Sequence, residues 1–313
     1  MMLRLVGQRL LYAIPTVFVL TALLFFSVTT ILGSPASMML GEDASPQAIA
    51  ELNAQYGFDR PALEQYVDWL GRAMHADFGR SFTTREPVAS AIAAALPVTL
   101  ELAVLSIALA ALAAVTLNSL PTARRVIRPL VVGANLVGIA MPNFVIGIAL
   151  IFAFSVSLRW LPSTGWVPWS QGLSTHVRHL VMPVLTLSAY YFGAFSLVYR
   201  AELREAYRRF YIRTARAKGA SETRVAFKHA LPNAVLPVIT FAGLSMGQLI
   251  GGAVVTETVF SMPGMGRLFV GAIAGRDFPV MLAIGMLVVF GVVIMNLITD
   301  LLYRLVNPQI RLG

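Results

Sequence analysis

The sequence contains no cysteine among its 313 residues. Disulfide bridges, thiolate metal sites and a cysteine nucleophile are therefore excluded. Charged residues are also scarce, because they make up 12% of the chain, whereas a soluble domain carries about 25%. Together with a mean hydropathy of +0.74, this scarcity predicts a protein that faces lipid over much of its surface.

Acidic and basic residues are missing from the centres of the apolar segments. Glu101, Glu257 and Asp300 all fall near the ends of these segments. A transporter driven by its own ion gradient usually buries such a residue at mid-membrane, and an intramembrane enzyme needs a catalytic set there. The sequence therefore favours a passive path over a secondary transporter or an enzyme, and it offers no catalytic residue.

The histidines do not indicate a metal site. Only His176 and His179 are close in the sequence, and they lie beside an expected membrane entry. An interfacial position explains this pair better than metal binding does. We therefore predict no metal site.

Six apolar segments are long enough to cross a membrane, which takes about 20 residues. The first is longer than the cleavable region of a signal peptide, so we expect it to stay as a span. The sequence thus predicts an all-α integral membrane protein with six transmembrane helices, at 10–31, 99–120, 130–157, 180–199, 233–256 and 278–300.

The basic residues predict the orientation of these spans. An N-terminus in the cytoplasm places sixteen of the 24 basic residues inside and eight outside, as the positive-inside rule requires. This clustering at segment ends also argues against nucleic-acid binding, despite the net charge of +9. We therefore expect both termini, 1–9 and 301–313, in the cytoplasm, with external loops at 32–98, 158–179 and 257–277.

The first external loop carries helix signals. Ser45 and Pro46 are typical of a helix start, and Gly57 is typical of an end. A second helix is predicted after Pro61, with an apolar stripe at helical spacing formed by Leu63, Tyr66, Val67 and Leu70. We expect a small helical cap on the outer face, with a poorly ordered loop as the alternative.

Two further patterns have more than one interpretation. In the second external loop, the aromatic rings suit membrane-interface anchors, and substrate contact is the alternative for Trp160, Trp166 and Trp169. In the fifth span, small residues recur every four positions, which allows close helix packing, at Gly243, Gly247 and Gly251. This face packs against another span of the chain, or it lies at a subunit interface or along a path.

The polar segment 200–232 holds nine basic and three acidic residues. Its composition predicts a helix over 201–217, a stop at Gly219 and a new helix capped by Ser221 over 222–229. One side of the first helix is expected to be apolar, through Leu203, Tyr207, Phe210, Tyr211 and Ala215. A basic anchor against anionic lipid accounts for the charge but not for this apolar side or the glycine.

This segment resembles the cytoplasmic loop of ABC importer permeases. The resemblance rests on Gly219, the nine residues that follow it, and then His229, Ala230, Leu231 and Pro232. The positions that are Glu-Ala-Ala in other branches are Arg213, Thr214 and Ala215, as in the dipeptide, oligopeptide and nickel branch. Similar stretches cover nearly the whole chain, and the long first loop resembles that of the first of the two permease partners.

The resemblance implies a type I ABC importer permease fold and a coupling helix before Gly219 that enters a groove on an ATPase. The residues that it assigns to ATPase coupling are Tyr211, Arg213, Thr214, Ala215, Arg216, Lys218, Gly219, His229, Leu231 and Pro232. Arg213, Arg216 and Lys218 are expected to pair with acids of that groove.

The resemblance also implies the partners and the location. They are a second permease subunit in a heterodimer, two cytoplasmic ATPase subunits and an external substrate-binding protein, in the bacterial plasma (inner) membrane. ATP and Mg belong to the ATPases, and no cofactor is bound by this chain. Di- and oligopeptides are the expected substrates, with nickel complexes, opines, glutathione or oligosaccharide as alternatives. The alternatives from other functional classes are a self-sufficient secondary transporter and a membrane scaffold.

Overall fold

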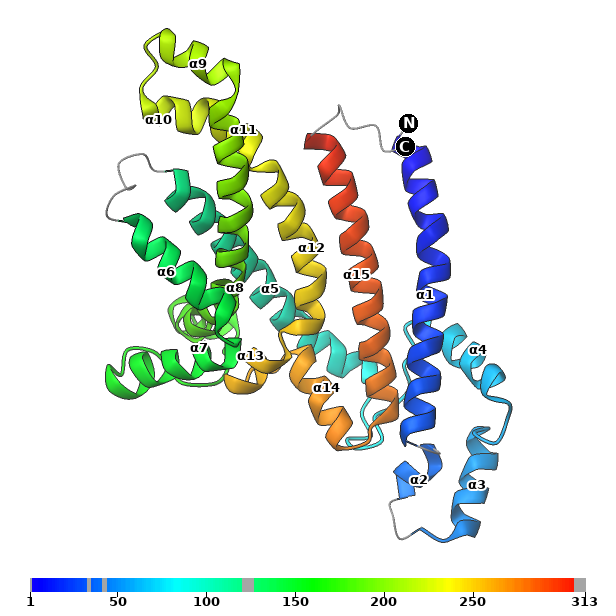
Figure 1. The fold of residues 1–313 in the computed structure, drawn as a ribbon. Coiled ribbons are helices and arrows are strands. Elements are labelled where there is room, and N and C mark those ends of the chain that lie inside the picture. Colours follow the sequence, from blue (N-terminus) through cyan, green and yellow to red (C-terminus); the bar gives the residue numbers. More distant parts are fainter. Residues whose placement is uncertain (1, 33–34, 41–43, 120–126, 307–313) are drawn as a thin grey trace. The chain divides into compact units, whose positions relative to one another are not determined.

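The computed structural model describes residues 2–32, 35–40, 44–119 and 127–306. Within these ranges every regular element is a helix (Figure 1). Residue 1 of the predicted N-terminal segment, residue 120 of the second predicted span and the last seven residues of the C-terminal segment lie outside the described residues.

Four helices are long and apolar enough to cross a membrane, and two bent helix pairs raise the number to six if each pair is one span. The four are α1 (Met2–Leu32), α5 (Val88–Ser119), α8 (Leu173–Arg208) and α15 (Phe278–Val306). The first pair joins α6 (Ile127–Ala140) to α7 (Asn143–Leu150) and the π-helical turn η2 (Ile151–Ser157). The second pair ends in α12 (Leu236–Gly252). The predicted all-α, multi-span class is confirmed.

The second span begins earlier than predicted. Helix α5 starts at Val88 instead of Thr99, and it keeps Pro97 inside. The alanine-rich sequence before Pro97 has high helix propensity, so the helix continues through it. As a result Glu101 lies in the interior of α5 and not near its start.

The third span is not one continuous helix. The helices on either side of Met141 and Pro142 are bent by 117°. Pro142 has no backbone N–H, and its ring disfavours helical geometry at the preceding residue. The fifth span is also broken, at Val235, and its two parts are bent by 48°. Pro237 follows this break at the start of α12.

The chain forms two compact units, which are described separately. Unit 1 comprises Met1–Thr99 and Pro263–Ile294, and unit 2 comprises Leu100–Met262 and Met295–Gly313.

The outer segment of unit 1 is helical, as expected. After α2 (Pro35–Leu40), helix α3 (Pro46–Tyr56) begins where the Ser45 Oγ accepts a hydrogen bond from the Ala48 N–H. It ends at Gly57, which has a left-handed φ of 71°. A side chain rarely adopts this φ, so the glycine is what allows the sharp stop. The predicted caps of this helix are confirmed.

Helix α4 (Ala62–Ala73) buries a different stripe from the predicted one. Tyr66 and Leu70 are buried as expected, but Leu63 and Val67 are 65% and 58% exposed. The buried face is completed instead by Trp69 and Ala73. Helical spacing fits both sets, and the buried set is decided by what the neighbouring helices offer.

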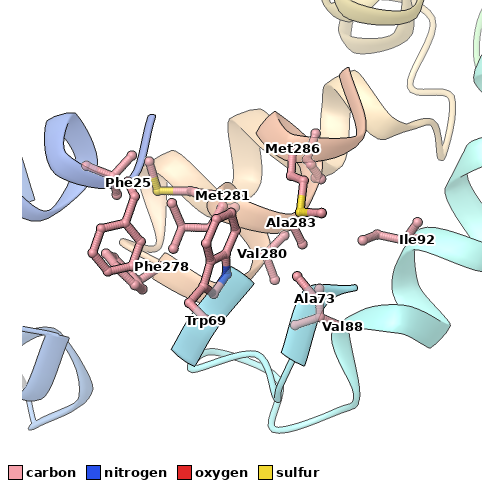
Figure 2. Packing of buried hydrophobic residues seen from close by; sticks show 14 of the residues in the cluster. Phe25, Trp69, Ala73, Val88, Ile92, Phe278, Val280, Met281, Ala283 and Met286 are labelled. Atoms are coloured by element: carbon pink, nitrogen blue, oxygen red, sulfur yellow. The ribbon is translucent and has the colours of Figure 1, made fainter. Parts of the chain in front are cut away.

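The core of unit 1 gathers aromatic and sulfur-containing side chains from three helices. Figure 2 shows Phe25 of α1, Trp69 of α4, and Phe278 and Met281 of α15 packed together. The Phe25 ring centroid lies 5.7 Å from that of Trp69 and 6.0 Å from that of Phe278. These contacts hold the outer helix against the spans.

Asp277, which directly precedes α15, binds the turn at residues 81–83, called the outer turn below. Its carboxylate is 3% exposed and accepts hydrogen bonds from the Ser81 hydroxyl, from the Phe82 N–H at 3.1 Å and from the Thr83 N–H at 3.3 Å. A buried carboxylate is stable only with such donors. This aspartate therefore connects two segments that are far apart in the sequence.

In unit 2, glycines bring α6 and α8 into backbone contact. A Cβ added at Gly138 would collide with the carbonyl group of Ala189, and one added at Gly193 would lie 2.9 Å from the Asn135 carbonyl oxygen. Only residues without a side chain permit this crossing. Sequence analysis did not identify this pair, because the two glycines are on different helices.

Replacing Gly138 by Ala is expected to lower the free energy of unfolding by about 1–3 kcal/mol, because the added methyl group meets backbone that cannot move aside. Gly133, on the same helix, has nothing within 4 Å of an added Cβ. Gly133→Ala is therefore expected to be neutral or to stabilise by up to about 1 kcal/mol. Unfolding in detergent micelles measures both, and equal effects would contradict the close crossing.

Candidate functional site

The polar segment begins with a break that the sequence did not indicate. Helix α8 continues to Arg208, and Arg209 is extended, with φ −69° and ψ 147°. A new helix, α9 (Phe210–Ala217), follows. The single helix predicted over 201–217 is therefore wrong. No glycine or proline marks the break, and Figure 1 shows α9 turned away from the direction of α8.

The break changes which side chains are buried. Leu203 and Ala215 are buried as predicted, but Ile212 is completely buried and Phe210 is 81% exposed. The expected apolar side is thus divided between two helices. Phe210 stands at the start of α9 as an exposed aromatic ring, and it is the most exposed of the large apolar side chains in the described part of the chain.

A glycine turn follows α9, as predicted. Gly219 has a left-handed φ of +79°, and its N–H donates to the Arg216 carbonyl at 2.9 Å. The Ser221 Oγ then accepts from the Arg224 N–H and begins α10 (Glu222–Arg224). The chain continues through the π-helical turn η4 (Val225–Ala230) into α11 (Leu231–Ala234). The predicted conformation of Gly219 and the cap at Ser221 are confirmed.

A small apolar core holds these pieces together. Ile212 of α9 packs in a layer with Val225, Ala226 and Ala230 of η4, which are all fully buried. Tyr211 adds a polar contact, because its hydroxyl oxygen accepts from the Asn233 side-chain amide at 3.2 Å. Helix α9, the turn η4 and helix α11 therefore form one folded body.

The cations predicted to pair with a partner differ in their surroundings. Arg216 donates from Nε and Nη2 to the two carboxylate oxygens of Glu222, at 2.8 and 3.0 Å. These hydrogen bonds raise the pKa of Arg216 above its ordinary value. Arg213 instead lies over the Phe210 ring, with Cζ 5.6 Å from the centroid. Arg216 thus has a carboxylate partner within the chain, whereas Arg213 contacts an aromatic ring.

The remaining residues that were predicted to couple lie on the same folded body. Thr214 is exposed on α9, although its hydroxyl donates to its own helix at Phe210 O, 3.2 Å away, and Lys218 is exposed just after α9 ends. His229 and Leu231 are half-buried, and Pro232 is exposed at the start of α11. The surface that this body presents is aromatic and cationic, which suits an acidic groove.

The glycine face of the fifth span packs closely against α15 at Gly243. A Cβ at Gly243 would collide with Thr299 of α15. Gly247 is buried on the same helix. Gly251 lies in α12, but its surroundings fall outside the described part of the chain.

A second polar cluster was missed by the sequence analysis. His176 Nε2 lies 2.8 Å from Glu101 Oε1, and Nδ1 lies 2.6 Å from the Val167 carbonyl oxygen. The Trp166 Nε1–H donates to the other Glu101 oxygen at 3.2 Å. The side chains of His176 and Glu101 are 3% and 14% exposed. Of the three loop tryptophans, Trp166 thus points inward, whereas Trp160 and Trp169 are 60% and 67% exposed.

His176 uses both ring nitrogens to connect different parts of unit 2. The Val167 carbonyl can only accept, so Nδ1 donates to it. Nε2 faces the Glu101 carboxyl group on α5. The signal for this cluster is spatial, because 75 residues separate the two partners.

Across the residues that the structure describes, no three His, Asp or Glu side chains come together in a way that could hold a metal ion.

Comparisons with known proteins identify the family. Residues 106–312 match the family described as binding-protein-dependent transport system inner membrane component, and residues 2–103 match its N-terminal companion family. A putative peptide transport system permease protein of Brucella melitensis biotype 1 is 36% identical over 313 residues, which cover 99% of each chain. A glutathione transport system permease protein of Escherichia coli is 38% identical over 312 residues, again covering 99% of each.

These matches agree with the spans and with the polar segment. The chain therefore belongs to the binding-protein-dependent transport system inner membrane components and is a multi-pass permease subunit of an ABC importer, not an enzyme.

Proposed function

We propose that α9 is the coupling helix that docks on a cytoplasmic ATPase subunit, and that this chain imports di- or oligopeptides. The observation that carries the docking proposal is the exposure of Phe210, at 81%, on a helix whose other face is buried through Ile212 and Ala215. Burying one aromatic ring of this kind at an interface is a frequent source of binding energy. Arg213 beside it supplies the charge that an acidic groove would recognise.

The proposed assembly contains a second permease subunit, two ATPase subunits and an external binding protein, with ATP and Mg bound by the ATPases. Both termini are proposed to be cytoplasmic, which the distribution of basic residues supports. The peptide substrate is supported by the names of the two relatives, since glutathione is itself a short peptide. We assign substrate selectivity to the external binding protein.

Phe210→Ala is expected to weaken ATPase docking about tenfold, as for a central aromatic residue of an interface. The measurement is co-purification of the ATPase with the permease complex, followed by ATP-driven uptake of a labelled dipeptide into proteoliposomes. Phe227→Ala is the matched control, because Phe227 is also exposed in this loop, at 39%, but lies on η4. If both variants bind and transport like the natural chain, the docking proposal is wrong.

The substrate is tested in the same proteoliposomes with the cognate binding protein. Unlabelled dipeptide, glutathione, a nickel complex and an oligosaccharide are added in turn as competitors. Competition by the peptides supports the peptide assignment. Competition by the nickel complex or the oligosaccharide alone rejects it and leaves the docking proposal untouched.

A further inference from the structure

Arg216 connects three elements of the polar segment. From α9 its guanidinium forms two hydrogen bonds with Glu222 on α10. The same group lies over the Tyr207 ring of α8, with Cζ 5.5 Å from the centroid. Its side chain therefore has contacts on both sides of the Gly219 turn and also on α8.

Several contacts cross the Gly219 turn. Gly219 itself has nothing within 4 Å of an added Cβ, and the Ala220 N–H donates locally to the Ala215 carbonyl at 3.1 Å. The Arg216 pair differs from these in its geometry. A planar guanidinium that pairs with both carboxylate oxygens restricts direction as well as distance.

A second contact lies on the other side of the turn. The Asn233 amide donates to the Tyr211 hydroxyl at 3.2 Å and to the His229 carbonyl at 3.2 Å. It therefore joins α9 to α11, which leads directly into α12. With the buried layer between α9 and η4, these contacts make α9 and the start of the fifth span one mechanical unit.

We propose that Arg216 is a positioning residue that fixes α9 against α10 and α8, so that displacement of α9 reaches the fifth span. This inference rests on the proposed coupling function of α9. It assigns Arg216 to a contact within the chain, whereas Phe210 and Arg213 face the partner. The distinction is chemical, because two of the guanidinium N–H directions of Arg216 are already used by Glu222.

The test is a charge exchange in the complete transporter. The variants are Arg216→Glu, Glu222→Arg and the two together, each assembled with its partner permease and ATPases and reconstituted with the binding protein. Each single change is expected to lower the substrate transported per ATP hydrolysed by about fivefold, and the double exchange is expected to restore most of it. ATPase co-purification should stay unchanged in all three.

Arg216→Lys tests whether the geometry of the pair matters in addition to its charge. A lysine keeps the charge but cannot pair with both carboxylate oxygens in a plane. We expect it to keep docking and to show a coupling ratio between those of the natural chain and Arg216→Glu. Glu205→Arg is the matched control, since Glu205 and Arg209 form a single exposed contact of 3.2 Å at the end of α8, and it should stay within about twofold.

The outcomes separate the alternatives. A double exchange that transports no better than the worse single variant overturns the positioning role. Loss of ATPase co-purification in Arg216→Glu that Glu222→Arg does not repair would also overturn it, because Arg216 would then pair with the ATPase. Failure of the coupling proposal itself has a different signature, namely normal docking of Phe210→Ala.

Discussion

Replacing His176 by Ala is expected to lower the free energy of unfolding by about 3–5 kcal/mol, the usual cost of removing one partner from a buried ion pair. The loss leaves the largely buried Glu101 with the Trp166 N–H as its hydrogen-bond donor among the described contacts, and it also removes the contact with the Val167 carbonyl. Denaturant titration of the purified chain in detergent micelles measures this change.

Two further variants show whether the effect comes from the pair. His179 is half-buried on the same helix and contacts only the Thr175 carbonyl in the described hydrogen bonds, so His179→Ala should change stability by less than about 1 kcal/mol. Glu101→Gln can donate to His176 and accept from Trp166, so it should cost about 1 kcal/mol or less. A small effect of His176→Ala would mean that water or another group replaces the ring.

Replacing Asp277 by Ala is expected to be the second most damaging change, at about 3 kcal/mol. The substitution leaves the Ser81 hydroxyl and the Phe82 and Thr83 N–H groups without their acceptor, and each buried unpaired donor costs about 1–3 kcal/mol before neighbours relax. The outer turn should also detach from α15. Trypsin cleavage after the exposed Arg80 and Arg85 should therefore become faster.

Asp77→Ala is the control for this prediction. Asp77 is exposed, and its carboxylate accepts a local hydrogen bond from the Gly79 N–H at 3.0 Å. Its removal should cost about 1 kcal/mol or less, like the loss of a local cap. Equal proteolysis of the Asp77 and Asp277 variants would show that the turn is held by something other than the buried carboxylate.

Local chemistry made several features predictable from the sequence. Ser45, Gly57, Gly219 and Ser221 have the predicted conformations because a cap or a left-handed turn depends on a few adjacent residues. The apolar segments were also found, since their length alone indicates a span. The folding of the polar segment around a glycine follows from the same local signals.

The features that were missed depend on contacts between distant residues. The break at Arg209 has no glycine or proline to mark it, and it decides that Phe210 is exposed while Ile212 is buried. The Glu101 and His176 pair joins positions on different helices, as do Gly138 and Ala189. The contact between Arg216 and Glu222 was missed for the same reason, because only the folded turn brings Glu222 to Arg216.

The length of α8 has a mechanical consequence. This helix contains 36 residues, so at 1.5 Å per residue it is about 54 Å long. His176 lies in its first turn and Arg208 is its last residue, next to the break before α9. A tilt of the helix by about 5° displaces one end relative to the other by about 5 Å. Helix α8 thus has the buried histidine near its first residue and the surface that we propose for docking next to its last. A small tilt of α8 about the histidine end would move the other end by roughly the length of a side chain.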